Sequence, residues 1–574
     1  MTNRAMEETF ESLRPDPATA ARYRAEGWWR DETFLDDLRR AAAQVPERPA
    51  IVNWRSAEGR AVIVTFGELA ERVDGFAAGL WGLGVRREVV AFQLPDWWET
   101  VALTLACWRI GAVGMPLALR FGPGEVARRL AATGAGVYVT VDTFQGTGYA
   151  AGVARLADEL PALRHRVVIG DAAATGALNF DECLRGDGRV PPEAVSLEPD
   201  DAAMVVFSSG TTGTAKGVVH SANTVYAAVS RPRPVAAPGS SGRPVPVLTP
   251  LNHGVGLRNV LRSVMGRTTA LCADVWDAGQ WLDLLSEYQA GPFGAPRARL
   301  QDLAEEQRRR PRALPAWEAV CSFAAQPSRH LVRLVREELA KRVLNAWGSS
   351  ESPACACTSV DDPPDWAAHS MGRPRPGVEL RLSPAPDHHL PESREPQVST
   401  VEVRSPSNCL GSFARDSGRL TWRPADTDGW YATGDLVRPD GRGGLAYVGR
   451  AADRISGVTS HMVPVHDVEE ELRDHPAVAE AVLVGYPDAQ HGELPCAVIV
   501  PADGQVPDVD ELRGHLAGRG MAEWCWPTRA EVLAELPRND LGKVRKDLLR
   551  SWLIGEHPLP GSTPAAAERA ARRS

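Results

Sequence analysis

The sequence predicts an α/β protein: a large N-terminal region of helices packed on mostly parallel sheets, then a small β subdomain and a compact α+β unit. Its 574 residues are too many for one hydrophobic core. Apolar strands alternate with helical stretches up to about residue 200, a pattern typical of parallel sheets. The predicted secondary structure changes to strands and turns after Gly372, and to an α+β pattern after Gly449.

The first region supplies the parallel sheet. A helical pattern over residues 66–84 precedes short apolar strands, which lie at residues 87–94, 136–141 and 165–170. The longest apolar run, residues 100–119, has the length of a membrane span, but it carries Arg109 in its middle and Gly and Pro in its second half. We therefore expect a buried helix that leads into a core strand.

The later elements are shorter. Strands of the β subdomain are expected at residues 372–383, 400–406 and 444–449. A helix at residues 465–476 and strands at 477–487 and 496–502 then predict the α+β unit, which ends near Leu553. Residues 554–574 are rich in Pro, Ala and Arg, and we expect them to form a disordered tail.

Composition narrows the function classes. The chain is 44% hydrophobic and 24% charged, as an ordinary globular protein is, and its net charge of −9 gives no reason to expect nucleic acid as a partner. The N-terminus has no apolar signal-peptide core, and the nine cysteines are odd in number. Both observations predict a cytoplasmic protein with reduced thiols and no membrane span. The oligomeric state cannot be read from the sequence.

The stretch VVFSSGTTGTAKGVVHS, residues 205–221, predicts a phosphate-binding loop. Backbone N–H groups of a turn rich in Gly, Ser and Thr can converge on an anion, and the hydroxyls add donors. The spacing is not that of the nucleoside-triphosphate loop, because Thr214 and Ala215 intervene before Lys216. Another kind of phosphate site is therefore expected here.

Lysine is rare in this chain. Four lysines stand against sixty arginines among the 64 basic residues. A lysine kept against that bias indicates a need for a compact ammonium that approaches one oxygen as a point charge. Lys216 and Lys543 each lie beside a glycine, where the backbone can come close to a ligand. Lys341 has no such neighbour and is interpreted as an ordinary surface lysine.

Five motifs together resemble the adenylate-forming superfamily of acyl-CoA synthetases, luciferases and peptide-synthetase adenylation domains. The loop at 208–221 is similar to the family's phosphate loop. The other four follow in the family's order: NAWGSSE at 345–351, GWYATGD at 429–435, GRAADRI at 449–455 and LPRNDLGKVRK at 536–546. The resemblance spans residues 40–553 and is strongest to bacterial CoA ligases for cyclic, aromatic or medium-chain acids.

The resemblance implies a domain of residues 1–448 that binds ATP and acid, and a small mobile lid of residues 449–553 with its hinge at 449–455. It implies ATP and Mg²⁺ as cofactors and CoA as second substrate. Lys543 would bridge the carboxylate and the α phosphate, Glu351 would hold Mg²⁺, and Asp435 with Arg450 would hold the ribose. The other implied site residues are Ser208, Ser209, Gly210, Thr211, Thr212, Gly213 and Lys216 for the phosphates, Trp347, Gly348 and Ser350 for the adenine, and Ala452 or Asp453 as the pivot.

Several of these residues have a structural alternative. Glu351, after two serines, is also the acid expected at a helix N-terminus. Asp435 in a Thr-Gly-Asp sequence is also a turn former, and Lys216 is also a solvated loop residue. His253 in TPLNHGVGL matches the family's histidine ahead of the acyl pocket, whereas a lone histidine is more often structural.

Three departures from the family pattern bear on the substrate. Phe323, in SFAAQP, stands where relatives have a glycine, and its ring would fill space used by long acyl chains, which favours a small or flat acid. Arg297 stands where a small hydroxylated residue is expected; it either meets a second anionic group of the substrate or points to solvent. After the hinge, the family's glycine appears as Ser460 or Thr459, which leaves the step with CoA in question.

The sequence therefore predicts an ATP-dependent enzyme that forms an acyl-AMP, releases pyrophosphate and transfers the acyl group to CoA. One alternative keeps adenylation but changes the acceptor to a carrier-protein thiol or an amine, or activates nitrite for diazo formation. An alternative of another class is a catalytically silent sensor that binds nucleotide or acyl groups. Lys543 and Glu351 argue against the sensor, because a silent protein needs neither.

Overall fold

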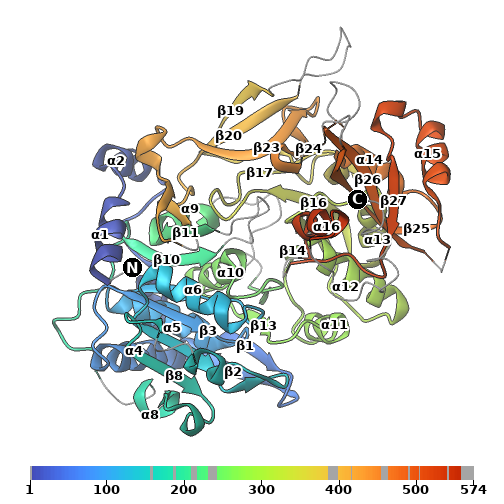
Figure 1. The fold of residues 1–574 in the computed structure, drawn as a ribbon. Helices are drawn as coiled ribbons and strands as arrows, with labels where there is room; N and C mark the ends of the chain where they lie inside the picture. The colour runs from blue at the N-terminus through green and yellow to red at the C-terminus, as the bar shows by residue number, and fades with distance from the viewer. Residues whose placement is uncertain are drawn as a thin grey trace.

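The computed structural model describes most of the chain, namely residues 3–155, 159–184, 189–207, 216–230, 242–385, 398–414, 417–453, 455, 463, 465–488, 492–502, 505–539 and 542–556. A large N-terminal part carries most of the sheets, and a smaller C-terminal part lies to one side of it, in red in Figure 1.

A nine-stranded sheet forms the centre of the large part. Its order is β22-β21-β11-β10-β4-β3-β5-β8-β9. The run from β10 through β9 is parallel, and β10, β11, β21 and β22 pair antiparallel. The bounds are β3 Val89–Gln93, β4 Val113–Pro116, β5 Val137–Val141, β8 His165–Ile169, β9 Leu178–Asn179, β10 Ala202–Phe207, β11 Lys216–Ser221, β21 Gly411–Ala414 and β22 Leu420–Trp422. The predicted parallel sheet is confirmed.

Helices cover this sheet and give it a buried core. The first ten are α1 Asn3–Ser12, α2 Pro17–Ala25, α3 Phe34–Gln44, α4 Phe66–Gly82, α5 Trp98–Arg109, α6 Pro123–Thr133, α7 Ala150–Ala154, α8 Phe180–Leu184, α9 Ala222–Ser230 and α10 Gly254–Met265. The long apolar run becomes α5 followed by β4, as predicted. Arg109 is the last residue of α5, where its Nε lies 3.2 Å from an Asp74 carboxylate oxygen. No helix in the described part of the chain is both long and apolar enough to cross a bilayer.

Two further sheets and a hairpin complete the α/β layers. One sheet has the order β12-β13-β1-β2, and a second runs β14-β15-β16-β17-β18. Their bounds are β1 Pro49–Arg55, β2 Arg60–Thr65, β12 Val245–Pro246, β13 Ala270–Ala273, β14 Gly294–Pro296, β15 Trp317–Phe323, β16 Ala340–Trp347, β17 Ala356–Cys357 and β18 Arg373–Pro374, with the hairpin β6 Thr143–Phe144 and β7 Thr147–Gly148. Three helices accompany the second sheet: α11 Ala278–Glu287, α12 Arg297–Arg309 and α13 Arg329–Glu338.

The predicted β subdomain is an antiparallel sheet of the order β19-β20-β23-β24. Its strands are β19 Glu379–Pro384, β20 Ser399–Arg404, β23 Tyr431–Pro439 and β24 Leu445–Arg450. Buried residues alternate in the second half of β20 and over Tyr431–Asp435 of β23, and β23 is then buried continuously to Val437. This sheet ends beside the C-terminal part, so β23 and β24 carry side chains to the boundary between the two parts (Figure 1).

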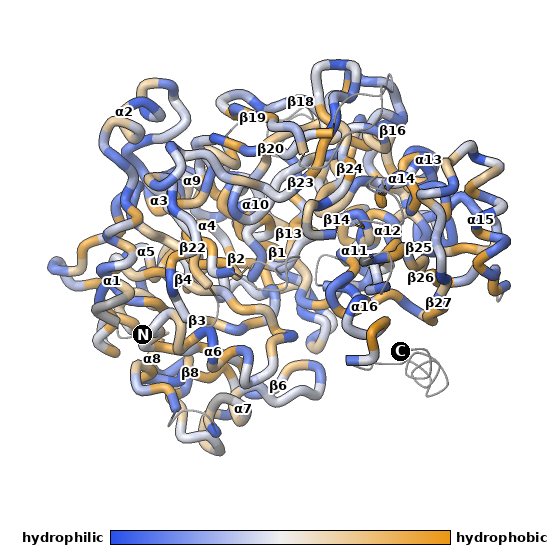
Figure 2. The backbone as a smooth tube through the Cα atoms, turned by 45° about the horizontal axis from the view of Figure 1, so that its top comes forward, coloured by the Kyte–Doolittle hydropathy of each residue, from blue (hydrophilic) through white to orange (hydrophobic). Residues whose placement is uncertain are grey.

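The C-terminal part has hydrophobic clusters of its own. The sheet β25-β26-β27 packs against three helices, and every residue of its two apolar clusters comes from Ile455 onward. The elements are β25 Val478–Asp488, β26 Gly492–Pro501, β27 Arg529–Val532, α14 Val465–Arg473, α15 Val509–Gly518 and α16 Lys546–Leu553. Figure 2 shows hydrophobic segments along the strands of this part. The division at residue 448 stays a prediction, and residues 557–574 of the expected tail lie outside the described residues.

Candidate functional site

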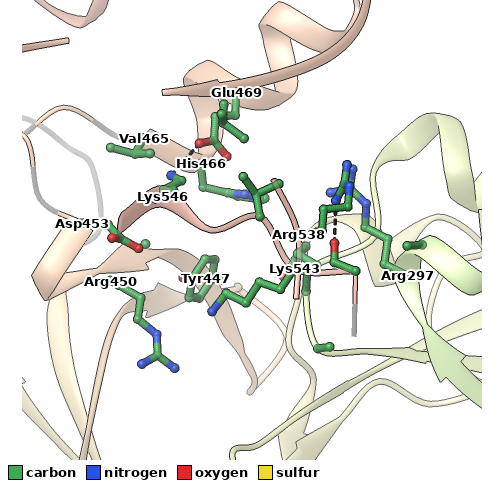
Figure 3. A pocket seen from close by; sticks show the side chains of 18 of the residues that line it. Arg297, Tyr447, Arg450, Asp453, Val465, His466, Glu469, Arg538, Lys543 and Lys546 are labelled. Atoms are coloured by element: carbon green, nitrogen blue, oxygen red, sulfur yellow. Dashed lines mark hydrogen bonds and ion pairs between the residues drawn. The ribbon is translucent and has the colours of Figure 1, made fainter. Parts of the chain in front are cut away.

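A cavity of about 210 Å³ lies between the two parts of the molecule. The large part contributes the start of α12, the turn after β15, the end of β16, and strands β23 and β24. The C-terminal part contributes α14 and the loop from Leu536 to Asp547 (Figure 3). Of the predicted site residues, those brought together here are Arg297, Trp347, Gly348, Asp435, Arg450, Asp453 and Lys543.

Lys543 enters this cavity from a tight turn. Its backbone N–H donates to Asn539 Oδ1 at 2.9 Å, and its carbonyl accepts from the Asn539 N–H at 2.9 Å. Gly542 has φ +72°, and a Cβ there would lie 2.4 Å from Ala298 Cβ of α12, so only glycine fits at this junction. The Lys543 side chain extends toward Tyr447 and Arg450 (Figure 3). Burial and, after it, the Arg450 charge lower the pKa of Lys543 to about 8.

Asp435 and Arg450 face each other across β23 and β24. They are register partners in the sheet, and Arg450 Nε lies 2.8 Å from Asp435 Oδ1. Trp347 Nε1 donates to Asp435 Oδ2 at 2.8 Å. Asp435 is only 4% exposed and lies inside β23, so the interpretation of it as a turn former is wrong. The carboxylate is held rigidly and still faces the cavity.

Trp347 and Gly348 continue the wall of the cavity at the end of β16. A Cβ on Gly348 would lie 2.6 Å from the backbone nitrogen of Ala354, so the chain folds back tightly there. Glu351 follows in a bend and is buried, so the interpretation of it as a helix N-terminal acid is wrong. Burial is the largest cause that raises the pKa of both Cys409 and Tyr431, and the negative charge of Glu351 is the second largest.

His220 is a residue that the sequence did not single out. Its Nε2 donates to the Ser350 carbonyl at 2.8 Å, and its Nδ1 accepts from the Thr224 hydroxyl at 3.0 Å. Burial, then the charge of Arg258, lowers the pKa of His220 to about 3, so the ring is neutral and keeps this tautomer. His220 therefore holds the backbone beside Glu351. The sequence could have pointed to His220 through its position in GVVHS, directly after the phosphate loop.

The flanks of the predicted phosphate loop are described in the structure. Ser208, Ser209, Gly210, Thr211, Thr212 and Gly213 lie outside the described residues. Its flanks are the antiparallel neighbours β10 and β11, and Lys216 begins β11. Gly217, beside Lys216, was expected to let the backbone approach a ligand. In the structure a Cβ on Gly217 would lie 2.2 Å from the Phe413 ring, so the glycine leaves space for that packed side chain. Burial and, next, the Glu351 charge raise the pKa of the Cys409 thiol, and the Lys216 charge offsets part of this effect.

His253 and Phe323 are not among the residues that line the described cavity. His253 caps α10, where Nδ1 accepts from the Val255 N–H at 3.2 Å. Phe323 ends β15, and its ring lies next to Gly294 of the neighbouring strand. The next residue, Ala324, has φ +72° and lines the cavity in its place. The acyl-pocket roles of His253 and Phe323 stay predictions.

The hinge region forms a 3₁₀ turn at Ala451–Asp453. Asp453 lines the cavity, and its carboxylate lies 3.2 Å from Arg550 of α16. This ion pair joins the turn to the C-terminal part. The choice between Ala452 and Asp453 as pivot stays a prediction, and Thr459 and Ser460 lie outside the described residues.

Three more residues at the cavity were not predicted. Tyr447 of β24 and His466 of α14 meet edge to face, with ring centroids 5.6 Å apart. Lys546 Nζ lies 2.6 Å from Glu469 of α14, so the last lysine of the chain fastens the loop that carries Lys543. By contrast Lys341 is exposed, as expected, and pairs with Glu318 on the surface.

Comparison with known proteins identifies the family. The family described as AMP-binding enzyme matches residues 38–408, and its C-terminal domain matches residues 467–543. The chain belongs to the AMP-binding enzyme family. This confirms the resemblance and the α/β fold class with a small C-terminal domain. The chain is an adenylating ligase, an enzyme of ATP-dependent acid activation.

Relatives in this family use different acceptors. The chain is 28% identical to medium-chain fatty-acid–CoA ligase of Escherichia coli, over 93% of each chain. It is also 28% identical, over 93% of each chain, to salicyl-AMP ligase / salicyl-S-ArCP synthetase of Mycobacterium tuberculosis. The solved structure of the amide bond synthetase McbA from Marinactinospora thermotolerans shares the fold, with a TM-score of 0.73 and 24% identity over 90% of this chain and 99% of that one.

Proposed function

We propose that the enzyme activates a small or flat carboxylic acid as an acyl-AMP and then transfers the acyl group to CoA. The observation that carries the adenylation step is the meeting of Lys543 with the Asp435–Arg450 pair in one cavity between the two parts. A cation from one part and a fixed carboxylate from the other are what a nucleotide bound between them would need.

Lys543 supplies the transition-state charge in this proposal. A carboxylate oxygen of the acid attacks the α phosphorus, the bond to the β phosphate breaks, and pyrophosphate leaves. Negative charge gathers on the phosphoryl oxygens during this step, and a fixed ammonium stabilises it. The low pKa of Lys543, about 8 in the free enzyme, still leaves the group charged at neutral pH.

Asp435 is proposed to accept hydrogen bonds from the ribose hydroxyls. Trp347 and Arg450 hold its carboxylate in place, and a group that is already oriented loses little freedom when the nucleotide binds. Trp347 and Gly348 would lie along the adenine. The loop from Ser208 to Lys216 would hold the β and γ phosphates.

Mg²⁺ fits the residues that are present. Mg²⁺ is usually bound by one or two carboxylates together with substrate phosphates, and no group of three or more metal-ligating side chains occurs among the described residues. The buried Glu351 would be the carboxylate that holds the ion, and Lys216 directly follows the phosphate loop in the sequence. When bound there, the ion would neutralise phosphate charge.

The size of the cavity supports a small acid. Its volume is about 210 Å³, and in this proposal the acid and the nucleotide would share it. The proposed role of Phe323 is that its ring fills space used by long acyl chains. CoA is the acceptor in the name of the Escherichia coli relative, whereas a carrier-protein thiol and an amine are the acceptors implied by the other two names. These, with nitrite activation, remain the alternatives.

The deciding assay is AMP release from ATP and Mg²⁺ with aromatic, cyclic and short aliphatic acids, and with nitrite plus an aminobenzoate, each with and without CoA. We expect release that depends on one acid class and rises sharply with CoA. Release that is indifferent to CoA would assign another acceptor. No AMP with any acid would contradict adenylation and favour a silent sensor.

A further inference from the structure

Two of the described cations in the cavity stand without a carboxylate partner. Lys543 and Arg297 both line it, and neither lies within ion-pair distance of an Asp or Glu in the described ranges of the chain. The proposed reaction uses Lys543. It gives Arg297 no role.

The other cations around the cavity are paired. Arg450 lies 2.8 Å from Asp435, and Lys546 lies 2.6 Å from Glu469. Arg538 pairs with Glu480 (Figure 3). Since each of these charges has an opposite charge beside it, the unpaired Arg297 is an exception that requires an explanation.

Arg297 faces other guanidinium groups. It is the first residue of α12, and its side chain lies beside Arg538 of the C-terminal part (Figure 3). Burial and, next, the charge of Arg473 lower the pKa of Arg297 to about 10; Glu470 offsets part of this effect. Burial and Arg473 also lower the pKa of Arg538. Arg473 is itself paired with Glu469 and Glu470, and Arg538 is paired with Glu480, so the cost of burying a charge beside like charges falls on Arg297.

The helix adds to that cost. The first turn of α12 has no acidic residue, and the positive end of the helix dipole disfavours a cation at this position. Arg297 is half-buried, so water does not screen it as it would a surface arginine. The alternative in which Arg297 points to solvent is therefore not what the structure shows. An anion beside it would relieve both repulsions.

We propose that Arg297 binds a second anionic group of the acid substrate, so that the enzyme prefers dicarboxylic acids, or acids with a sulfonate or phosphonate in that place. The inference rests on the proposed function. A guanidinium donates two parallel hydrogen bonds to a planar carboxylate, which Lys543 cannot do. Ala325 and Gln326 line the same enclosure, so one acid can lie along this turn between the two cations.

The test uses matched acids that differ only in the second charge, such as benzoate with phthalate and butyrate with succinate. Hydroxylamine as acceptor makes AMP formation independent of CoA. The wild type should show a kcat/KM at least tenfold higher for the doubly charged member of one pair. Arg297→Gln should lose about a hundredfold on that acid and change less than threefold on its partner and on KM for ATP. Arg297→Lys should fall between them.

Arg310→Gln, at the exposed end of the same helix, is the matched control and should behave as the wild type. Equal losses on both members of every pair would show that Arg297 only supports the fold and would overturn the proposal. If Arg297→Gln instead raises KM for ATP, the anion beside Arg297 belongs to the triphosphate or pyrophosphate. If it raises only KM for CoA, the anion belongs to the acceptor. Either result would also overturn the proposal.

Thermal stabilisation separates this proposal from the proposed function. With AMP present, doubly charged acids should raise the melting temperature of the wild type but not of Arg297→Gln. Such stabilisation without AMP formation from any acid would overturn adenylation and keep the anion site. AMP formation from acids without preference for a second charge, and no stabilisation, would overturn the anion site and keep adenylation.

Discussion

Gly542 and Ala298 touch across the boundary between the two parts of the molecule. A Cβ on Gly542 would lie 2.4 Å from Ala298 Cβ, and the next residue after Gly542 is Lys543. The junction therefore sets how far the Lys543 ammonium reaches into the cavity. Misplacing a reacting group by about 1 Å can cost a hundredfold in rate.

Gly542→Ala should lower acid-dependent AMP formation at least tenfold without weakening nucleotide binding. The added methyl group prevents the close approach to α12. Gly555→Ala is the control for backbone strain, because Gly555 has φ +76° but a Cβ added there would have no atom within 4 Å. Ala298→Gly combined with Gly542→Ala should restore part of the rate. Equal effects of Gly542→Ala and Gly555→Ala would count against the junction.

Asp435→Asn should raise KM for ATP about 10- to 100-fold. The change removes the charge that balances Arg450 and weakens the acceptor of the Trp347 N–H, while the size of the side chain is kept. The measurement is initial rate against ATP concentration at saturating acid. Asp426→Asn, which removes only an exposed pair with Arg423 at 2.9 Å, should leave KM unchanged. An unchanged KM in Asp435→Asn would remove Asp435 from the nucleotide site.

The rate should depend on the protonation of Lys543. Its pKa of about 8 is below the ordinary value for lysine, so the ammonium is present below pH 8 and is lost as the pH rises through this value. We expect kcat/KM for ATP, which reports groups of the free enzyme, to fall about tenfold per pH unit above pH 8. The fall in kcat should occur at a higher pH than the fall in kcat/KM, because a bound phosphate stabilises the charged form of Lys543. A profile that is flat to pH 9.5 would contradict this.

Local patterns predicted much of the fold. Strands β3, β5 and β8 are short apolar runs. The buried helix α5 and strand β4 follow from a run that has the length of a membrane span but carries Arg109 in its middle and Gly and Pro in its second half. The segments named from the motifs also meet as expected, since Trp347, Asp435 and Lys543 line one cavity. These residues were named because their motifs resemble those of the adenylate-forming superfamily, and spacing or composition alone would not have placed them in one site.

Contacts between distant segments could not be predicted. His220 supports Ser350 across 130 residues, and Tyr447 meets His466 from the other part of the molecule. Neither contact has a periodic or compositional signal. The same holds for Arg297: the sequence showed an unusual residue, but only the structure shows that it lies at the start of α12 and lines the cavity.

Lys543→Ala tests the central claim most directly. We expect acid-dependent AMP formation to fall by about a hundred- to a thousandfold, while the dissociation constant for ATP changes less than threefold. Lys341→Ala, the loss of an exposed lysine paired with Glu318, is the control and should keep full activity. Near-normal AMP formation in Lys543→Ala would contradict the assignment of this cavity as the site of adenylation.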